Sequence, residues 1–373
     1  MKILYLSTSY IPYRRADSVH VMHMCQALAL AGHTVNLVYK KSSKFSEKTA
    51  DPYEFYGVQN VFQLTGINRP AFKGGGILYS WGMKWFLRGQ RENIDLIFSR
   101  DIAGAIYAME YDLPLVYETH VIPDNESHLN SIKRILAYPK LVSVVILTNG
   151  LLRDFKSKFI NDLTDQKLIV AHDAFTPKKG ESVFCEKIEV GRPAVGYAGN
   201  LYAGKGMEVI GALAGKLPEY DFNVAGGEEK DIAHWKSIFP FPNLSFVGFM
   251  PPVDLANFYK NQNVLLLPPL KKSLGLSGNN ISGWMSPMKL FEYMNTGRPI
   301  VASNLEVLKE VLDDGRNALL ADPDHLDEWV TAIKNLIQGS EMSLRLSANA
   351  RKDLLSNYTW EKRVQHILSE SNL

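Results

Sequence analysis

Two glycine-containing loops in the C-terminal half combine residue types that bind phosphate. The first, YAGNLYAGKG, runs from Tyr197 to Gly206 between an apolar run of strand length and a helical pattern. Gly199, Gly204 and Gly206 permit close backbone approach, the helix start favours an anion, and Lys205 adds a positive charge. Gly206 stands where a P-loop has the serine or threonine that binds magnesium. The loop therefore predicts a phosphate site without that metal ligand; the alternative is a glycine-rich turn with a solvated lysine.

The second loop precedes another predicted helix, in the stretch SGNNISGWMSPMKLFEYMNTGRPIVAS. Pro287 fits the first turn of that helix, where proline is tolerated, and Ser286 is the predicted N-cap. The first backbone N–H groups, including those of Met288 and Leu290, would face an anion together with the ammonium group of Lys289. This loop predicts a second phosphate contact.

Glu292 lies one to two turns into the same predicted helix. A carboxylate can accept hydrogen bonds from two vicinal hydroxyl groups, such as those of a ribose. The alternative is an exposed helix acid without a ligand. Two cations and this carboxylate in one domain suit a nucleoside diphosphate, so we expect a nucleotide site in the C-terminal half.

The elements that must position these residues alternate between strand-length apolar runs and helical patterns. In the N-terminal half the expected strands are 2–7, 34–40, 95–99, 114–118, 144–148 and 168–172, and the first helix is expected near 19–32, with Asp17 or Ser18 as its N-cap and Gly32 at its end. In the C-terminal half the expected strands are 194–200, 221–227, 244–249, 264–269, 299–303 and 318–322, and helical patterns occupy 207–216, 254–261, 289–297 and 305–313, followed by three more. This alternation predicts an α/β fold of doubly wound parallel sheets.

The chain is expected to form two domains because 373 residues exceed the usual size of one hydrophobic core. We expect an N-terminal Rossmann-like domain at 1–176, a linker at 177–191, a C-terminal Rossmann-like domain at 192–356, and a helix at 357–373 that crosses back to the first domain. Ligands of parallel sheets bind beyond the carboxyl ends of the strands. The site is therefore expected in a central cleft between the two domains.

Composition excludes several other classes of protein. A formal net charge of +2 provides no global field for nucleic acid, and Cys25 and Cys185 lie too far apart in the sequence for a metal or redox motif. The N-terminus has no signal-peptide pattern, and no apolar run approaches the length of a membrane span. The acid pair at Asp322 and Asp324 predicts a turn and a helix cap, and no metal site is expected. A cytoplasmic protein, soluble or peripheral on the inner face of the cell membrane, is the expectation.

Taken together, the pieces GHTVNLV, GNLYAGKG, VAGGEE, FVGFMPP, VLLLPP and FEYMNTGRPIVAS resemble the group 1, or GT4-type, retaining glycosyltransferases of GT-B fold. The resemblance covers most of the chain, and the ensemble is more specific than any one piece. It implies transfer of a sugar from a nucleotide-diphosphate donor to a glycan or lipid-linked acceptor with retention, in bacterial surface polysaccharide or glycoconjugate biosynthesis. It implies no metal and no cofactor beyond the nucleotide sugar as co-substrate.

The same resemblance assigns roles to individual residues. His120, in VYETH, would lie beside the transferred sugar, Glu292 would bind the ribose, and Phe249 and Met250 would contact the base. His120, Lys205 and Glu292 are the expected catalytic residues. The donor diphosphate would be bound by Gly199, Asn200, Lys205, Ser286, Met288, Lys289 and Leu290. From the residues alone, a structural imidazole after a strand is the alternative for His120.

Two positions depart from the family pattern. Asn200 stands where an arginine is usual, and Trp284 stands where the first acid of a paired-glutamate motif is usual. Some family members have an S-P-x-K loop there, which the SPMK sequence resembles, so Lys289 would replace the absent arginine. The loss at Trp284 bears on the identity of the transferred sugar more than on nucleotide binding.

The acceptor is expected at the first domain, in the loop after the first strand. Arg14 and Arg15 could receive an anionic acceptor such as a lipid pyrophosphate, and Asp17 belongs to the same expected site; a solvated pair of arginines is the alternative. Farther on, GILYSWGMKWFLRGQR places Leu78, Trp81 and Trp85 on one helical stripe flanked by basic residues. Such a helix can lie in an anionic membrane interface or pack its stripe on the domain's own sheet. The basic stretches KKSSKFSEK and RPAFKGGG belong to the same domain.

Two other functions use the same architecture. A non-hydrolysing sugar-nucleotide epimerase also needs a nucleotide site, and a non-catalytic nucleotide-sugar-binding partner subunit would explain the loss of the acid at Trp284. A dinucleotide-dependent oxidoreductase is disfavoured because STSYIPYRRAD, and not G-x-G-x-x-G, follows the first strand.

Overall fold

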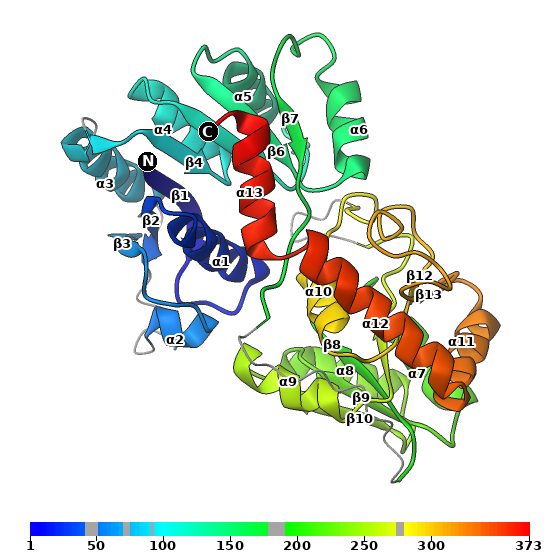
Figure 1. The fold of residues 1–373 in the computed structure, drawn as a ribbon. Helices are drawn as coiled ribbons and strands as arrows, with labels where there is room; N and C mark the ends of the chain where they lie inside the picture. Colours follow the sequence, from blue (N-terminus) through cyan, green and yellow to red (C-terminus); the bar gives the residue numbers. More distant parts are fainter. Residues whose placement is uncertain (42–50, 70–74, 91–92, 178–190, 274–279) are drawn as a thin grey trace. The chain divides into compact units, whose positions relative to one another are not determined.

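The chain forms two compact units, each built around a parallel sheet. The computed structural model describes residues 1–41, 51–69, 75–90, 93–177, 191–273 and 280–373 (Figure 1). Met1–Asp173 and Trp360–Leu373 make up the N-terminal unit, and Ala174–Thr359 make up the C-terminal unit. The linker predicted at 177–191 lies almost entirely outside the described residues. The last helix, which the sequence places at 357–373, belongs to the N-terminal unit from Trp360 onward.

The N-terminal unit alternates strands and helices from its first residues. Its elements are β1 (Lys2–Tyr10), α1 (Ala16–Leu30), β2 (Thr34–Lys41), α2 (Pro52–Tyr56), β3 (Gln63–Asn68), α3 (Gly75–Gln90), β4 (Leu96–Ser99), α4 (Ile102–Glu110), β5 (Leu115–Thr119), α5 (Glu126–Leu136), β6 (Leu141–Ile146), α6 (Asn149–Lys158), β7 (Leu168–Val170) and α13 (Trp360–Ser371). The seven strands are ordered β3-β2-β1-β4-β5-β6-β7. Neighbouring strands pair in parallel, so their carboxyl ends share one edge of the sheet.

The C-terminal unit repeats this plan with a smaller sheet. Its elements are β8 (Ala194–Ala198), α7 (Met207–Lys216), β9 (Asp221–Ala225), α8 (Glu229–Ile238), β10 (Leu244–Gly248), α9 (Pro252–Lys260), β11 (Val264–Leu267), α10 (Met288–Asn295), β12 (Ile300–Ser303), β13 (Leu319–Ala321), α11 (Leu326–Gln338) and α12 (Ser340–Asn357). Its parallel strands are ordered β10-β9-β8-β11-β12-β13. The reversal of order beside β8 creates the kind of switch point at which such sheets bind ligands.

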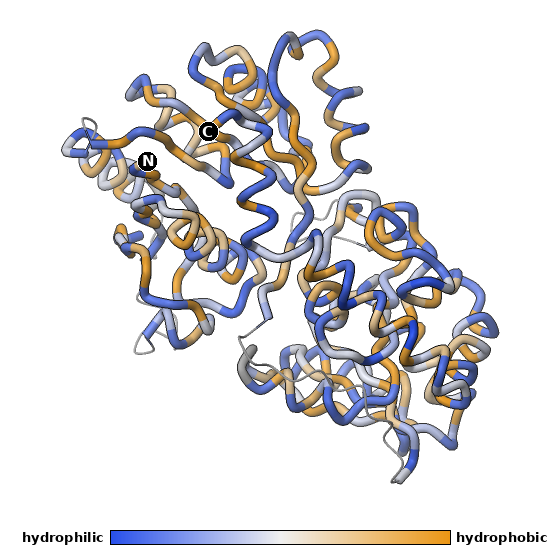
Figure 2. The backbone as a smooth tube through the Cα atoms, in the orientation of Figure 1, coloured by the Kyte–Doolittle hydropathy of each residue, from blue (hydrophilic) through white to orange (hydrophobic). Residues whose placement is uncertain are grey.

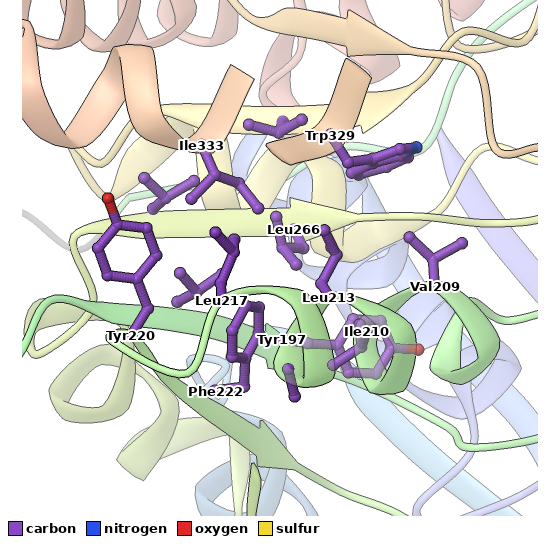
Figure 3. Packing of buried hydrophobic residues seen from close by; sticks show 14 of the residues in the cluster. Tyr197, Val209, Ile210, Leu213, Leu217, Tyr220, Phe222, Leu266, Trp329 and Ile333 are labelled. Carbon is purple, nitrogen blue, oxygen red and sulfur yellow. The ribbon is translucent and has the colours of Figure 1, made fainter. Parts of the chain in front are cut away.

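The cores lie between each sheet and the helices that cover it. Figure 2 shows that apolar segments follow the strands of both units. In the C-terminal unit, Ile210 and Leu213 of α7 and Trp329 and Ile333 of α11 pack with Leu266 of β11 (Figure 3). The burial of strands on both faces explains why they appear in the sequence as unbroken apolar runs.

The predicted doubly wound α/β architecture is confirmed, with differences at particular elements. β3 and α8 were not predicted. β3 has no continuous apolar run, and none of its residues is buried. The helix expected at 305–313 is absent: successive turns form there, and they bury Leu308 and Leu312. Two hydrogen bonds of helical spacing remain, from Lys309 to Leu305 and from Leu312 to Leu308, but they do not continue into a helix.

The first helix begins earlier than predicted. α1 has Arg15 at its N-cap position, and neither Asp17 nor Ser18 caps it, because Asp17 lies within the first turn and the Ser18 hydroxyl donates to the Tyr10 carbonyl at 2.8 Å. The predicted end is confirmed, since α1 stops at Leu30 and Gly32 follows in the left-handed region with φ +93°.

Candidate functional site

The loop between β8 and α7 is shaped by its glycines. Gly206 occupies the N-cap position of α7 with φ +105°, and a side chain there would collide with the carbonyl group of Pro268. Gly204, with φ +81°, lies equally close to the backbone of Lys272. Both the left-handed conformation and the tight packing require glycine on either side of Lys205. The GKG sequence therefore fixes where the Lys205 side chain emerges.

The backbone N–H groups of this loop are largely used within the protein. The N–H of Gly199 donates to the Ala225 carbonyl at 2.9 Å, and that of Lys205 donates to the Tyr202 carbonyl at 3.0 Å. The N–H of Gly204 donates to the Glu208 carboxylate at 2.9 Å. A phosphate group would accordingly be met by the lysine side chain and the start of α7, which has no side-chain cap, and not by a ring of loop amides.

The start of α10 differs from its predicted form by one residue. Pro287 occupies the N-cap position and Met288 is the first helical residue, so the buried Ser286 is not the N-cap. The N–H of Leu290 donates to the Pro287 carbonyl at 2.8 Å and is therefore engaged, contrary to the expectation of a free donor. Because α10 has no side-chain cap either, its first turn presents the positive end of the helix dipole.

Lys289 brings the two predicted loops together. Its Nζ lies 4.0 Å from the centroid of the Tyr197 ring, at the end of β8. The same ammonium group lies so close to Gly199 that any side chain at that position would displace it. Asn200 follows Gly199 and is exposed. Lys289 thus lies beside Gly199, the residue before Asn200. Asn200 stands where the resemblance expects an arginine.

Lys205 and Lys289 are two half-buried cations without acidic partners. Among the residues that the structure describes, neither lysine forms an ion pair with a carboxylate, although many exposed lysines of the chain do. Burial, and after it the charge of Lys205, lower the pKa of Lys289 to about 7, while Glu292 acts in the opposite direction. Burial also lowers the pKa of Lys205. An anion placed between the two side chains would relieve both effects.

Glu292 lies next to this pair on the same helix. Its Oε2 accepts a hydrogen bond of 2.7 Å from the hydroxyl of Tyr259. Burial raises the pKa of Glu292, and the Tyr259 hydrogen bond and the charge of Lys289 oppose that rise. The Tyr259 ring packs edge-on against Tyr293, whose hydroxyl accepts the N–H of Ala198 at 2.9 Å. Tyrosines of α9 and α10 therefore hold the carboxylate beside the end of β8.

The sequence analysis did not identify Tyr197, Tyr259 or Tyr293 as parts of this site. The signal available for them was weak, because tyrosines at helical or strand spacing more often belong to a core. The predicted base-binding residues follow β10: Phe249 is 41% exposed, whereas Met250 packs against the hydrophobic core. Trp284 lies half-buried in the turn before α10.

In the N-terminal unit, His120 follows β5 and contacts two charged residues. Its Nε2 lies 2.5 Å from Oε1 of Glu118, and its Nδ1 lies 3.0 Å from a guanidinium nitrogen of Arg100. Donation from Nε2 to the carboxylate leaves Nδ1 as the acceptor from Arg100. Burial, and then Arg100, lower the pKa of His120 to about 4, so the imidazole is neutral at pH 7. β4 and β5 are neighbours, which explains why the residues that follow them meet.

A buried charge network supports this histidine. Arg363 of α13 donates to Oε1 of Glu118 at 3.0 Å, and His20 of α1 lies between Glu118 and Asp173, at 3.0 and 2.7 Å. Burial alone would raise the pKa of Glu118, but Arg363 and His20 outweigh it and hold that pKa well below its ordinary value. None of these partners was predicted, since nothing in the sequence links α13 to β5.

The ligand atoms of His20, Glu118 and His120 all lie within 4.8 Å of one another, close enough in principle to hold a metal ion. Oε1 of Glu118, however, already serves the guanidinium of Arg363. A second guanidinium, from Arg100, lies beside the His120 ring, 3.3 Å from its Nε2 and 3.0 Å from its Nδ1. Two fixed positive charges oppose a cation there, so we interpret the cluster as a charge network.

The predicted acceptor residues lie in the loop between β1 and α1. Asp17 is held between Nε of Arg15 at 2.9 Å and the hydroxyl of Ser9 at 2.8 Å, so Arg15 is not an unpaired cation. Arg14 is exposed. His120 lies after β5, two strands away from β1 in the same sheet.

Comparison with known proteins gives a family match in the C-terminal part of the chain. Residues 208–369 match the family described as Glycosyl transferase-like. The chain is 24% identical, over 52% of its own length and 44% of the relative's, to a D-inositol 3-phosphate glycosyltransferase of Corynebacterium kroppenstedtii. It is 23% identical, over 98% and 97% of the two lengths, to an uncharacterized glycosyltransferase of Methanocaldococcus jannaschii.

The chain also resembles solved structures over its whole length. HepE of Anabaena, in complex with UDP, superposes with a TM-score of 0.70 at 18% identity and covers 100% of both chains. The fold is therefore GT-B, as predicted. Matches to the first curated relatives span less than half of those proteins, at 44%, 31% and 38%. Within the described residues, no helix is long and apolar enough to cross a membrane.

Proposed function

We propose that this protein is a glycosyltransferase that moves a sugar from a nucleoside-diphosphate donor to a glycan or lipid-linked acceptor. The observation that carries the proposal is the convergence of Lys205 and Lys289, from two elements, as half-buried cations with no carboxylate bridging them in the described chain. A diphosphate supplies the missing negative charge. The UDP bound to the Anabaena neighbour and the similarity to proteins named as glycosyltransferases support the same choice.

In the proposed complex, each group of the C-terminal unit has one task. Lys205 and Lys289 bind the diphosphate together with the starts of α7 and α10. Glu292 uses the carboxylate oxygen that Tyr259 does not occupy to accept the ribose hydroxyls. Phe249 and Met250 contact the base. Binding of the nucleoside diphosphate part of the donor therefore needs no group outside this unit.

The transfer step breaks the bond between the anomeric carbon and the diphosphate while the acceptor oxygen bonds to that carbon. The acceptor's proton leaves with an oxygen of the departing diphosphate, and the configuration is retained. Negative charge grows on the diphosphate during this step, so Lys205 and Lys289 stabilise the transition state more than the ground state. No metal and no further cofactor are part of the proposal.

We propose that His120 contacts the transferred sugar. A neutral imidazole whose orientation is set by Glu118 can hydrogen-bond a sugar hydroxyl without carrying a competing positive charge. Arg14, Arg15 and Asp17 are proposed to receive the acceptor. Assembly of a bacterial surface polysaccharide or glycoconjugate, on the cytoplasmic face of the cell membrane, is the biological setting that we infer for such an acceptor.

A donor panel tests the proposal directly. The purified chain is incubated with UDP-, GDP-, ADP- and dTDP-sugars, and thermal stability and nucleotide release are recorded with and without bacterial lipid extract. We expect one donor to stabilise the protein, and extract to stimulate release of the nucleotide. Glu292→Gln, which keeps the shape and removes the charge, should lose both responses.

The matched control is Lys216→Met. Lys216 is an exposed lysine of α7 that is already paired with Asp327, so its removal should leave donor binding unchanged. If no nucleotide sugar stabilises the wild type, the transferase proposal fails. Conversion of the donor to an isomer without any acceptor would replace it with an epimerase.

A further inference from the structure

Helix α3 of the N-terminal unit carries an exposed aromatic face. Trp85 is 80% exposed and Trp81 67% exposed, and Leu78, one turn before Trp81, is 45% exposed. Trp85 is the most exposed large hydrophobic side chain in the described part of the chain. With 3.6 residues per turn these three side chains form one stripe along the helix. Large side chains of this kind are ordinarily covered by protein, lipid or ligand.

The unit itself does not need this face for packing. The opposite stripe of α3, Tyr79, Met83 and Leu87, is buried, with each side chain at most 4% exposed. The Tyr79 hydroxyl donates to the Ser7 carbonyl at 3.4 Å, which anchors the helix to β1. Of the two arrangements that the sequence allowed for the stripe of Leu78, Trp81 and Trp85, packing on the unit's own sheet is therefore excluded.

Two further contacts fix the rotation of α3. The hydroxyl of Tyr107 in α4 donates to Ser80 at 2.8 Å, and Lys84 pairs with Glu110 of α4 at 2.8 Å. α3 also packs on β3, which is an edge strand of the sheet. Figure 1 shows α3 at the periphery of its unit. The tryptophans consequently point outward because the other sides of the helix are engaged.

The positive charge of the sequence around α3 favours an anionic partner. From Arg69 to Arg91 the sequence contains five basic residues and no acidic one. Arg88 is exposed, lies one turn beyond Trp85 on the aromatic stripe, and forms no ion pair within the described residues. Tryptophan prefers the boundary between lipid headgroups and acyl chains, and an arginine beside it can reach anionic headgroups. Aromatic and cationic groups on one face thus match an anionic lipid surface.

We propose that the outer face of α3, defined by Leu78, Trp81, Trp85 and Arg88, inserts into an anionic membrane interface and holds the protein there. The helix lies along the surface and does not cross it. The contact is reversible, because one short amphipathic helix buries little apolar area and attraction to lipid charge is weakened by salt. This inference goes beyond the proposed transfer reaction and does not depend on it, because α3 contributes no residue to the donor site.

Vesicle co-sedimentation of the full chain tests the proposal. Vesicles of phosphatidylglycerol and phosphatidylcholine are compared with vesicles of phosphatidylcholine alone, at low and high sodium chloride. We expect binding to the anionic vesicles, weaker binding at high salt, and little binding to phosphatidylcholine. Trp81→Ser combined with Trp85→Ser should weaken partitioning on the order of a hundredfold, at about tenfold for each indole removed from the interface.

The control variant is Ile160→Ser, which removes an equally exposed apolar side chain, at 70%, from another part of the same unit. It should bind vesicles like the wild type. Equal binding by the double tryptophan variant, or failure of the wild type to bind anionic vesicles, overturns the proposal, and equal binding to phosphatidylcholine overturns its electrostatic part. Thermal shift with nucleotide sugars is measured in the same variants, so a failure of membrane binding is distinguished from a failure of donor binding.

Discussion

Replacing Lys289 by methionine should make the protein more stable and, at the same time, unable to bind nucleotide. Burial and the charge of Lys205 lower the pKa of Lys289 from its ordinary value of 10.5 to about 7. The unfolded chain therefore binds a proton at this side chain more tightly than the folded chain does. Between those two pKa values the free energy of unfolding rises with pH, and only below pH 7 does it carry the full penalty of the buried charge.

The size of the effect follows from the pKa shift. At about 1.4 kcal/mol per pKa unit, the buried ammonium group destabilises the folded protein by about 5 kcal/mol well below pH 7 and by about 4 kcal/mol at pH 7, where half of the folded molecules have lost this proton. Methionine removes this penalty and fills a similar volume, but it also removes the interaction of the ammonium group with Tyr197, worth about 1 kcal/mol. We expect a net gain of about 1–3 kcal/mol in the absence of nucleotide.

The assay is urea or thermal unfolding at pH 7 with and without UDP. A ligand present at about 100 times its Kd stabilises the wild type by roughly 2.7 kcal/mol, and Lys289→Met should lose that response. Lys216→Met should change neither quantity by more than about 0.5 kcal/mol. A variant that is less stable than the wild type without UDP, yet still stabilised by UDP, would refute the assignment of Lys289 as an uncompensated cation that awaits a diphosphate.

Three further outcomes test other parts of the structure. UDP affinity measured by calorimetry should fall by up to roughly tenfold per pH unit from pH 7 to about 9, because free Lys289 loses its proton above a pKa of about 7; a flat profile in the wild type would contradict this. Arg363→Met leaves Glu118 buried without its guanidinium and should destabilise the N-terminal unit by about 3 kcal/mol in urea unfolding, with Glu118→Gln in the same chain restoring part of the loss. Gly206→Ala should lower stability and UDP affinity more than Gly315→Ala, since both glycines have positive φ but only the first has a carbonyl oxygen in the way; equal losses would show that packing is not the cause.

The strands of both sheets were predictable because parallel strands are buried on both faces. Their apolar runs therefore stand out whatever the rest of the fold does. β3 was not predicted because it is an edge strand, and none of its residues is buried. The helix expected at 305–313 was a wrong prediction. Its apolar residues have helical spacing, but they lie in successive turns that bury Leu308. Local pattern reports burial more reliably than it reports backbone conformation.

Lys205, Lys289 and Glu292 stood out in the sequence as candidates because their charges lie within or just after glycine- and proline-containing loops at the starts of helices. Their surroundings were not, since the contacts of Tyr197 with Lys289 and of Tyr259 with Glu292 join residues far apart in the sequence. His120 was predicted through the resemblance of VYETH to the family sequence. Glu118, two positions earlier, was overlooked because an acid within an apolar strand gives no hint of the partner that neutralises it.

Because α13 belongs to the N-terminal unit but is synthesised last, the unit that is made first is completed only at the end of translation. Arg363, which neutralises Glu118, follows it by 245 positions in the chain. Residues 1–173 therefore leave the ribosome with a buried carboxylate that has no guanidinium, whereas every strand of the C-terminal unit has been made before α13 appears. The unit that is synthesised first is the last to reach its final stability, and a nascent chain stalled before Trp360 would present an unfinished N-terminal unit to chaperones and proteases.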